Sequence, residues 1–424
     1  MRSVQEHQRV VAEMMRACRP ITVPLTQAQG LVLGGDVVAP LSLPVFDNSA
    51  MDGYAVRAED TSGATPQNPV MLPVAEDIPA GRADMLTLQP VTAHRIMTGA
   101  PVPTGATAIV PVEATDGGVD SVAIRQQATP GKHIRRSGED VAAGTTVLHN
   151  GQIVTPAVLG LAAALGLAEL PVLPRQRVLV ISTGSELASP GTPLQPGQIY
   201  ESNSIMLAAA VRDAGAAVVA TATAGDDVAQ FGAILDRYAV DADLIITSGG
   251  VSAGAYEVVK DAFGSADYRG GDHGVEFVKV AMQPGMPQGV GRVAGTPIVT
   301  LPGNPVSALV SFEVFIRPPL RMAMGLPDPY RPHRSAVLTA SLTSPRGKRQ
   351  FRRAILDHQA GTVISYGPPA SHHLRWLASA NGLLDIPEDV VEVAAGTQLQ
   401  VWDLTLTGPI LVPCTQPAAR SSVR

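Results

Sequence analysis

Four short segments rich in glycine and small polar residues follow predicted strands between residues 175 and 305. They read STGSEL (182–187), AGDD (224–227), SGGVSAG (248–254) and LPGNP (301–305). Glycine lets a ligand approach the backbone closely, and helix N-termini present unpaired N–H groups to anions. We predict that these loops bind a phosphate-bearing small molecule; the alternative is that they are ordinary turns and caps. The candidate binding residues are Ser182, Thr183, Gly184, Ser248, Gly249, Gly250, Gly303 and Asn304.

Carboxylates lie beside these loops at Glu186, Asp226, Asp227 and Glu257. They would repel a phosphate unless a metal ion intervened, and Mg²⁺ held by one or two carboxylates and the ligand phosphates would resolve this. We predict that one or two of these four carboxylates hold the metal ion. The alternative is that Asp226 or Asp227 simply caps a helix over 226–240.

A second group of polar residues lies in the segment FDNSAMDGYAV (46–56), where Asp47, Asn48, Ser49 and Asp52 crowd a short loop. This segment is either an Asx-rich turn or a finger that completes a binding site. The segment RRSGED (135–140) brings charges of both signs, including Asp140, which are either surface charges or part of the same site.

The loops after residue 175 need a sheet to position them. Apolar runs predict strands at 177–183, 217–224 and 243–248, and further strands in EFVKVAM and TPIVTLP. Helices are predicted between and after them, over 203–214, 226–240, 256–263 and 304–324. This alternation favours a doubly wound parallel sheet, in which ligands bind at the carboxyl ends of the strands.

The rest of the chain divides into further domains, so the predicted fold class is multidomain α/β. A helix over 3–18, with Ser3 as its cap, is expected to pack beside a helix over 156–168. The predicted domains are a helical linking domain (1–40 with 141–174), a β-rich module (41–140), the doubly wound domain (175–326), a small C-terminal β-barrel with a helical segment near 371–380 (327–415) and a disordered tail (416–424).

Composition limits the classes of function. A net charge of −6 argues against general nucleic-acid binding, which needs a basic face. The two cysteines form no disulfide framework or zinc pattern, and the charged N-terminus has no signal-peptide core. The most apolar stretch, 153–172, contains a proline, glycines and a glutamate, so we read it as a buried helix. These features predict a cytoplasmic protein with no membrane insertion.

Segments along nearly the whole chain resemble the molybdopterin molybdenumtransferase family, which includes the bacterial MoeA proteins and the E-domains of a plant counterpart and of gephyrin. The matching segments are 46–56, IMTGAPVPTGATAIVPVE (96–113), 134–144, 182–187, GQIYESNS (197–204), 246–254 and 301–318. The resemblance implies a homodimer whose doubly wound, MogA-like domain binds adenylylated molybdopterin. It also implies insertion of molybdate into that substrate, with release of AMP and help from Mg²⁺.

The resemblance further implies that the catalytic cleft lies between the doubly wound domain of one subunit and the β-rich module of the other. It places Asp52, Asp140, Glu186, Asp227 and Glu257 among the family's functional carboxylates, without settling the choice of Asp227 over Asp226. Of these, it implies Glu186, Asp227 and Glu257 as the metal ligands. The implied contacts to molybdate or the cofactor are Ser252, Pro302, Pro305, Arg353 and Ser371, with Lys279 near the cleft.

This chain departs from the family pattern at three positions. Glu257 stands where the family commonly has aspartate, and QPGMP (283–287) stands where it commonly has KPGKP, so Gln283 and Met286 replace two lysines. Loss of two cations should weaken oxyanion binding. We therefore retain an alternative, a gephyrin-like dimeric scaffold for cytoskeletal, cell-division or membrane-receptor proteins with weakened or lost catalysis. The predicted enzyme could also bind proteins of the cofactor pathway, and use of tungstate instead of molybdate stays open.

Overall fold

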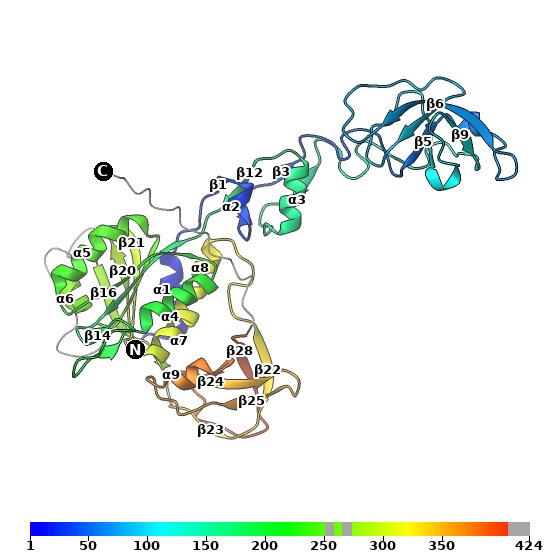
Figure 1. Ribbon diagram of the computed structural model, residues 1–424. Coiled ribbons are helices and arrows are strands. Elements are labelled where there is room, and N and C mark those ends of the chain that lie inside the picture. The colour runs from blue at the N-terminus through cyan, green and yellow to red at the C-terminus, as the bar shows by residue number, and fades with distance from the viewer. Residues whose placement is uncertain (251–257, 265–273, 406–424) are drawn as a thin grey trace, which may run out of the picture. The chain divides into compact units, whose positions relative to one another are not determined.

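The computed structural model describes residues 1–250, 258–264 and 274–405. The chain divides into two compact units, coloured by residue number in Figure 1. The first unit contains Met1–Ile21, Gly30–Gly34 and Pro171–Arg424, and the second contains Thr22–Gln29 and Gly35–Leu170. The chain therefore crosses between the two units four times, and it stays in the first unit from residue 171 onwards.

A six-stranded sheet forms the centre of the first unit. Its strand order is β16-β13-β17-β21-β20-β18. The four parallel strands are β16 (Ala217–Ala224), β13 (Arg177–Thr183), β17 (Leu244–Ser248) and β21 (Thr296–Leu301). β13, β17 and β21 are buried almost throughout, and their apolar runs explain why the sequence pattern predicted them. β16 is the edge strand and is only partly buried.

The other two strands correct the prediction of a wholly parallel sheet. β20 (Pro287–Val293) and β18 (Gly274–Lys279) are antiparallel to their neighbours. β20 was not predicted, because Gly289 and Gly291 weaken its strand pattern. Both glycines are needed there, since a Cβ atom would collide with Thr300 at position 289 and with the backbone of Gly274 at position 291.

Helices cover both faces of this sheet (Figure 1). Val178 and Val180 of β13 pack towards α4 (Asn203–Asp213) and α7 (Pro305–Ser311), whereas Leu179 and Ile181 pack towards α5 (Val228–Tyr238) and α6 (Val258–Gly264). The alternation of side chains along a strand thus gives two cores, which confirms the doubly wound architecture.

The segment predicted as one helix over 304–324 begins with Pro305 in its first turn, as expected, but it is not uniform. It consists of α7, a π-helical turn η5 (Phe312–Ile316) and α8 (Arg317–Ala323). Prolines occupy the start of α8 and cannot donate backbone hydrogen bonds, which accounts for the break in the α-helical pattern.

The first helix, α1 (Val4–Met14), is capped by the hydroxyl of Ser3, which accepts a hydrogen bond from the N–H of Glu6. It does not pack beside the helix at 156–164, as we had expected. Val4 and Val11 are instead buried in the same core cluster as Phe312 and Phe315. The apolar side chains of η5 and α8 cover the apolar face of α1. The sequence pattern shows that α1 has an apolar face, but it does not show which element packs against that face.

Acidification is expected to destabilise the first unit through His7 of α1. This side chain is fully buried against Phe315, with 4.7 Å between ring centroids. Burial, with a smaller contribution from Arg2, lowers the pKa of His7 from 6.5 to about 4. Between these values the unfolded chain binds a proton that the native chain does not. The free energy of unfolding should therefore fall by about 3 kcal/mol as the pH decreases from 6.5 to 4.

Urea unfolding at several pH values tests this expectation. The substitution His7→Gln should remove this component of the pH dependence, whatever it does to stability at neutral pH. His149→Gln, at an exposed histidine, is the matched control and should keep the wild-type dependence. Equal acid sensitivity in His7→Gln and the wild type would contradict the assignment.

A small barrel forms the C-terminal part of the first unit, as predicted. Its strand order is β19-β24-β25-β22-β28-β26, and β24 also pairs with β26, which closes it. Its strands are β19 (Met282–Gln283), β22 (His333–Leu338), β24 (Arg349–Asp357), β25 (Thr362–Ser365), β26 (Gly382–Ile386) and β28 (Gln398–Asp403). The short helix α9 (Leu374–Ala378) and a two-stranded ribbon, β23 (Leu342–Thr343) with β27 (Glu392–Val393), complete it.

The second unit is β-rich, as predicted, with a five-stranded sheet of order β8-β5-β7-β6-β9. These strands are β5 (Gly53–Val56), β6 (Val70–Ile78), β7 (Ala93–Ile96), β8 (Ala108–Pro111) and β9 (Ser121–Ile124). Smaller pairs join β4 (Asn48–Ser49) to β10 (Ile134–Arg135) and β3 (Val37–Val38) to β11 (Thr146–Leu148). Its helices are α2 (Leu25–Ala28) and α3 (Pro156–Ala164), with short 3-10 turns η1 (Ala58–Thr61) and η2 (Val112–Ala114).

The remaining elements are short. They are β1 (Ile21–Pro24), β2 (Val32–Leu33), β12 (Glu169–Leu173), β14 (Leu187–Ala188), β15 (Ile199–Tyr200) and the 3-10 turn η3 (Ala239–Asp241). Over the described ranges, no helix has both the length and the apolar character needed to cross a membrane.

Candidate active site

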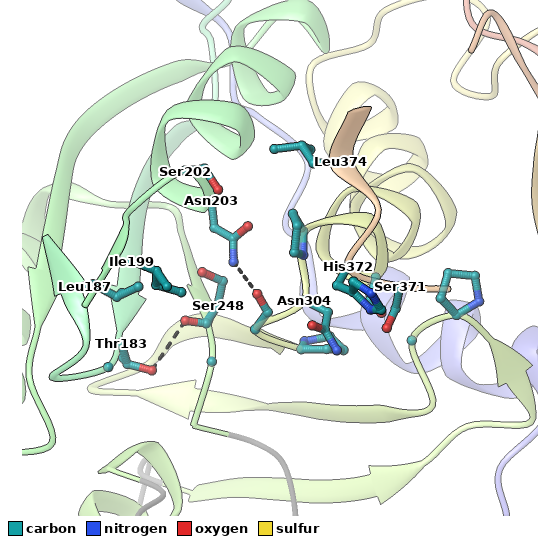
Figure 2. A pocket seen from close by; sticks show the side chains of 18 of the residues that line it. Thr183, Leu187, Ile199, Ser202, Asn203, Ser248, Asn304, Ser371, His372 and Leu374 are labelled. Carbon is teal, nitrogen blue, oxygen red and sulfur yellow. Dashed lines mark hydrogen bonds between the residues drawn. The ribbon is translucent and has the colours of Figure 1, made fainter. Parts of the chain in front are cut away.

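A pocket with a volume of about 1070 Å³ lies beside the glycine-rich loops of the first unit. Figure 2 shows side chains from the sheet loops and from the barrel around the same space. The residues that line it are Thr183, Gly184, Glu186, Leu187, Ile199–Asn203, Asp226, Ser248–Gly250, Gln283–Gly285, Pro287, Pro302–Pro305, Ser307, Pro369–His372 and Leu374.

The register of the parallel strands brings the four loops to one edge of the sheet, as predicted. Ser182 of β13 is paired with Ser248 of β17, and Ser248 is paired in turn with Leu301 of β21. On the other side of β13, Thr183 is paired with Ala224 of β16. All four strands therefore end at the same level, and the loops that follow them contribute to one pocket.

The loops after β13 and β17 approach each other so closely that glycine is required at position 249. Gly249 has φ +94°, and a Cβ atom there would lie 2.7 Å from both the backbone oxygen and the hydroxyl of Thr183. Within the loop after β13, Gly184 has φ +145° and lies against the Glu186 carboxylate. A Cβ atom at Gly303 would lie 3.5 Å from the Cα of Gly249, so the loops after β17 and β21 are also neighbours.

Hydrogen bonds hold the start of α4 against these loops. The buried carboxylate of Glu201 accepts hydrogen bonds from the Ser182 hydroxyl at 2.7 Å and from the backbone and hydroxyl of Ser204 at 2.7 and 2.6 Å. Asn203 donates from Nδ2 to the carbonyl of Gly303 at 2.7 Å (Figure 2). The Ser182 hydroxyl is thus used in a structural hydrogen bond, and Ser182 is not among the described lining residues.

Two neighbouring aspartates have different roles. Asp227 caps α5, because its Oδ1 accepts a hydrogen bond from the N–H of Ala229 at 2.9 Å. Asp226 lines the pocket and is joined to Ser185 by reciprocal contacts between backbone and side chain. The structure therefore favours Asp226, not our predicted Asp227, as the carboxylate that accompanies Glu186 in the lining.

The segment that departs from the family pattern forms part of the pocket wall. Gln283, Pro284, Gly285 and Pro287 all line it. The Oε1 atom of Gln283 accepts a hydrogen bond at 3.0 Å from Gln350 of the barrel, so a neutral amide pair occupies this position. Met286 is half-buried, and its side chain is not among the described lining residues.

The barrel contributes the loop 369–372, which places Ser371 in the lining. Arg353 does not line this pocket among the described residues. Its guanidinium is buried and donates to the backbone oxygens of His373, at 2.9 Å, and of Pro368. Burial lowers the pKa of Arg353. Arg353 therefore holds the loop that presents Ser371 to the pocket.

Several of the predicted site residues are not among the described residues that line this pocket. Lys279 is exposed at the end of β18 and is not among the lining residues. Ser252 and Glu257 lie outside the described residues. Asp52 and Asp140 belong to the second unit, where both are exposed.

Asp52 has a defined environment within its own unit. Its Oδ1 accepts hydrogen bonds from the N–H and the hydroxyl of Thr98, at 2.6 and 2.7 Å. These contacts lower the pKa of Asp52 and keep it ionised. The neighbouring Asp47 accepts hydrogen bonds from the Ser137 N–H and from Arg136, so the segment 135–140 supports the 46–56 loop.

Sequence reasoning did not single out Glu201, Asn203 or His372, which also line the pocket. The polar run ESNS (201–204) could have indicated the first two, because it spans the start of α4, a helix that begins at the same sheet edge. His372 follows no predicted sheet strand, and only the folded barrel places it there.

The fold and the pocket define a multidomain α/β protein with a ligand-sized pocket at the carboxyl edge of its sheet. Three family descriptions match the chain in order: the MoeA N-terminal region (domain I and II) at residues 2–166, a probable molybdopterin binding domain at 179–322 and the MoeA C-terminal region (domain IV) at 335–404. The chain belongs to the molybdopterin molybdenumtransferase family. As a member, it is a transferase of molybdenum cofactor biosynthesis.

Relatives and solved structures agree over nearly the full length. Molybdopterin molybdenumtransferase 1 of Mycobacterium tuberculosis is 37% identical over 432 residues, covering 96% of this chain and 100% of the relative. The molybdopterin molybdenumtransferase of Bacillus subtilis is 33% identical, with 94% and 93% covered. A crystal structure of the molybdopterin biosynthesis MoeA protein from Pyrococcus horikoshii superposes with a TM-score of 0.76 at 28% identity, covering 95% of this chain and 98% of that one.

Proposed function

We propose that this chain inserts molybdate into adenylylated molybdopterin and releases AMP, using the pocket at the carboxyl edge of its sheet. The observation that carries this proposal is the convergence of four strand-following loops on one pocket of about 1070 Å³. That volume suits a nucleotide joined to a pterin, and the glycines at positions 249, 250 and 303 allow phosphates to approach the backbone.

The charge of the lining supports a requirement for Mg²⁺. The described lining residues include three carboxylates, Glu186, Glu201 and Asp226, but no lysine or arginine. Among the residues that the structure describes, no cluster of three or more His, Cys, Asp or Glu side chains could hold a metal ion by itself. Glu186 and Asp226 fit the usual mode of Mg²⁺, in which one or two carboxylates share the ion with substrate phosphates. Bound there, Mg²⁺ would neutralise charge on the phosphates as the pyrophosphate bond breaks.

A second copy of the chain completes the proposed site. Asp52 and Asp140 lie on a unit that is separate from the pocket-bearing unit in the chain's own contacts. We infer that a homodimer brings these carboxylates from one subunit to the pocket of the other. Thr98 holds the Asp52 carboxylate ionised, so it could position a cation or a reacting proton there.

The proposed reaction is tested by incubating the purified chain with adenylylated molybdopterin, Mg²⁺ and molybdate. We expect AMP release that depends on molybdate, together with formation of molybdenum cofactor. A folded protein that releases no AMP in response to molybdate would overturn the proposal. Stoichiometric recovery of a cytoskeletal, cell-division or receptor protein by that inactive chain would then support the scaffold alternative.

Mixed dimers test whether the site is shared. Asp52→Asn and Gly249→Ala chains should each have at most about a hundredth of the wild-type activity alone, because each homodimer lacks one half of both sites. Denatured together and refolded, they should recover about a quarter of the wild-type sites, since half of the dimers would contain one intact site. If the mixture stays as inactive as the separate variants, the shared site is wrong.

Alanine substitutions of Asp226 and Asp227 should have different effects, one on the Mg²⁺ dependence and the other on stability. Asp226→Ala removes a lining carboxylate, so the Mg²⁺ concentration for half-maximal AMP release should rise by roughly tenfold, with little change in stability. Asp227→Ala removes the cap of α5 and should lower the free energy of unfolding by about 1 kcal/mol, with the Mg²⁺ dependence unchanged. Magnesium titrations and urea unfolding of both variants measure this, and the reverse pattern would restore Asp227 as the metal ligand.

A further inference from the structure

The C-terminal barrel carries a second hollow, which is separate from the pocket described above. This groove has a volume of about 790 Å³ and lies between the β23–β27 ribbon and the barrel strands β24 and β25. Its lining shares no residue with the candidate active site. Leu342, Ile364 and Val393 give it an apolar wall, and Ile364 is 42% exposed.

A guanidinium without an ionic partner lies in this groove. Arg352 donates from Nη1 to the carbonyl of Thr343 at 3.1 Å, and within the described chain no carboxylate lies within ion-pair distance of it. Its Nε is buried without a hydrogen-bond partner, as is the hydroxyl of Ser365 on the neighbouring strand. Burial lowers the pKa of Arg352.

Arg352 differs in this respect from the other arginines of strand β24. Arg349 forms a two-point ion pair with Asp385, and Arg353 holds the loop before α9 through backbone oxygens. A half-buried cation that keeps hydrogen-bonding capacity unused is unfavourable by itself, and an anion entering the groove would relieve this cost.

The remaining lining residues limit the anion. Glu392 also lines the groove, beside Thr343 across the ribbon, so a second negative charge on the ligand would be repelled. The apolar wall favours a ligand with a hydrocarbon part. We propose that this groove binds a small organic monocarboxylate, whose carboxylate contacts Arg352 and whose hydrocarbon part packs on Leu342, Ile364 and Val393.

Calorimetric titration of the full-length protein with hexanoate tests the proposal. We expect saturable binding below about 10 mM, with hexanol and sulfate binding at least tenfold more weakly. Arg352→Gln should weaken hexanoate binding by at least about tenfold, because a charge-assisted contact is lost. Arg346→Gln removes an exposed arginine of the same barrel and should bind hexanoate like the wild type.

Ile364→Asp provides a second variant if Arg352→Gln does not fold. It adds a negative charge at an exposed position of the wall and leaves Arg352 in place, so hexanoate binding should again weaken at least tenfold. Binding that both variants leave unchanged would overturn the proposal, as would equal binding of sulfate or no saturation by hexanoate. AMP release is measured separately and does not enter this test. The proposal for the groove and the proposed reaction can therefore be overturned independently of each other.

Discussion

The substitution Gly249→Ala is expected to lower kcat/KM for molybdate-dependent AMP release by about a hundredfold. A Cβ atom at this position would lie 2.7 Å from the Thr183 backbone oxygen, and φ of +94° disfavours any L side chain. The loop after β17 must therefore move away from the loop after β13. Both loops line the pocket, so the substrate phosphates would lose their position.

A matched variant separates this displacement from general backbone strain. Gly361 lies in the turn between β24 and β25 with φ +65°, and a Cβ atom there meets no atom within 4 Å. Gly361→Ala should lower stability by about 1 kcal/mol and leave activity unchanged. Steady-state kinetics and urea unfolding of both variants measure the two effects. If Gly249→Ala kept full activity while folded, the glycine contact would not be needed for the pocket.

The second large effect is expected from Gln283→Lys, which should lower the KM for molybdate by roughly 10- to 100-fold. Gln283 lines the pocket, and a lysine there would add a cation to a described lining that contains none. A charge-assisted hydrogen bond to an oxyanion contributes roughly 1.5–3 kcal/mol. Gln350 can accommodate the change, because its unpaired Oε1 could turn to accept a hydrogen bond from the new ammonium group.

Gln283→Met is the control, because it removes the amide and adds no charge. Its KM for molybdate should stay at or above the wild-type value in the same AMP-release assay. Met286→Lys should have a smaller effect than Gln283→Lys, since Met286 is not among the described lining residues. A Gln283→Lys enzyme that is folded and has an unchanged KM would show that the missing lysine does not limit oxyanion binding.

Local patterns in the sequence were sufficient to predict the parallel part of the fold and the position of its pocket. RVLVIST and DLIITS are apolar along their length because both faces of the sheet are covered, so they were recognisable as buried strands. Once strands alternate with helices, the parallel arrangement brings the loops after them to one edge. The prediction that STGSEL, AGDD, SGGVSAG and LPGNP share one site follows from this topology, and their described residues confirm it.

The tertiary structure alone decided between residues that local pattern treats as equal. Asp226 and Asp227 are adjacent and identical in type, but only the direction of the backbone entering α5 determines which one caps the helix. Arg353 was predicted as a ligand contact, and the barrel uses it to hold a backbone loop. Such roles depend on neighbours that are distant in sequence.

The packing of the helices and strands also depended on contacts between residues that are distant in sequence. The apolar face of α1 was evident from the sequence, but its partner, the segment of η5 and α8, is about 300 residues away, and only the fold joins them. The antiparallel strand β20 was hidden by the two glycines that its close neighbours require. The sequence by itself thus determined most of the elements of the parallel sheet, the family and the sheet edge that forms the pocket. The tertiary structure decided which side chains line that pocket and which are used to build it, because this choice depends on long-range contacts.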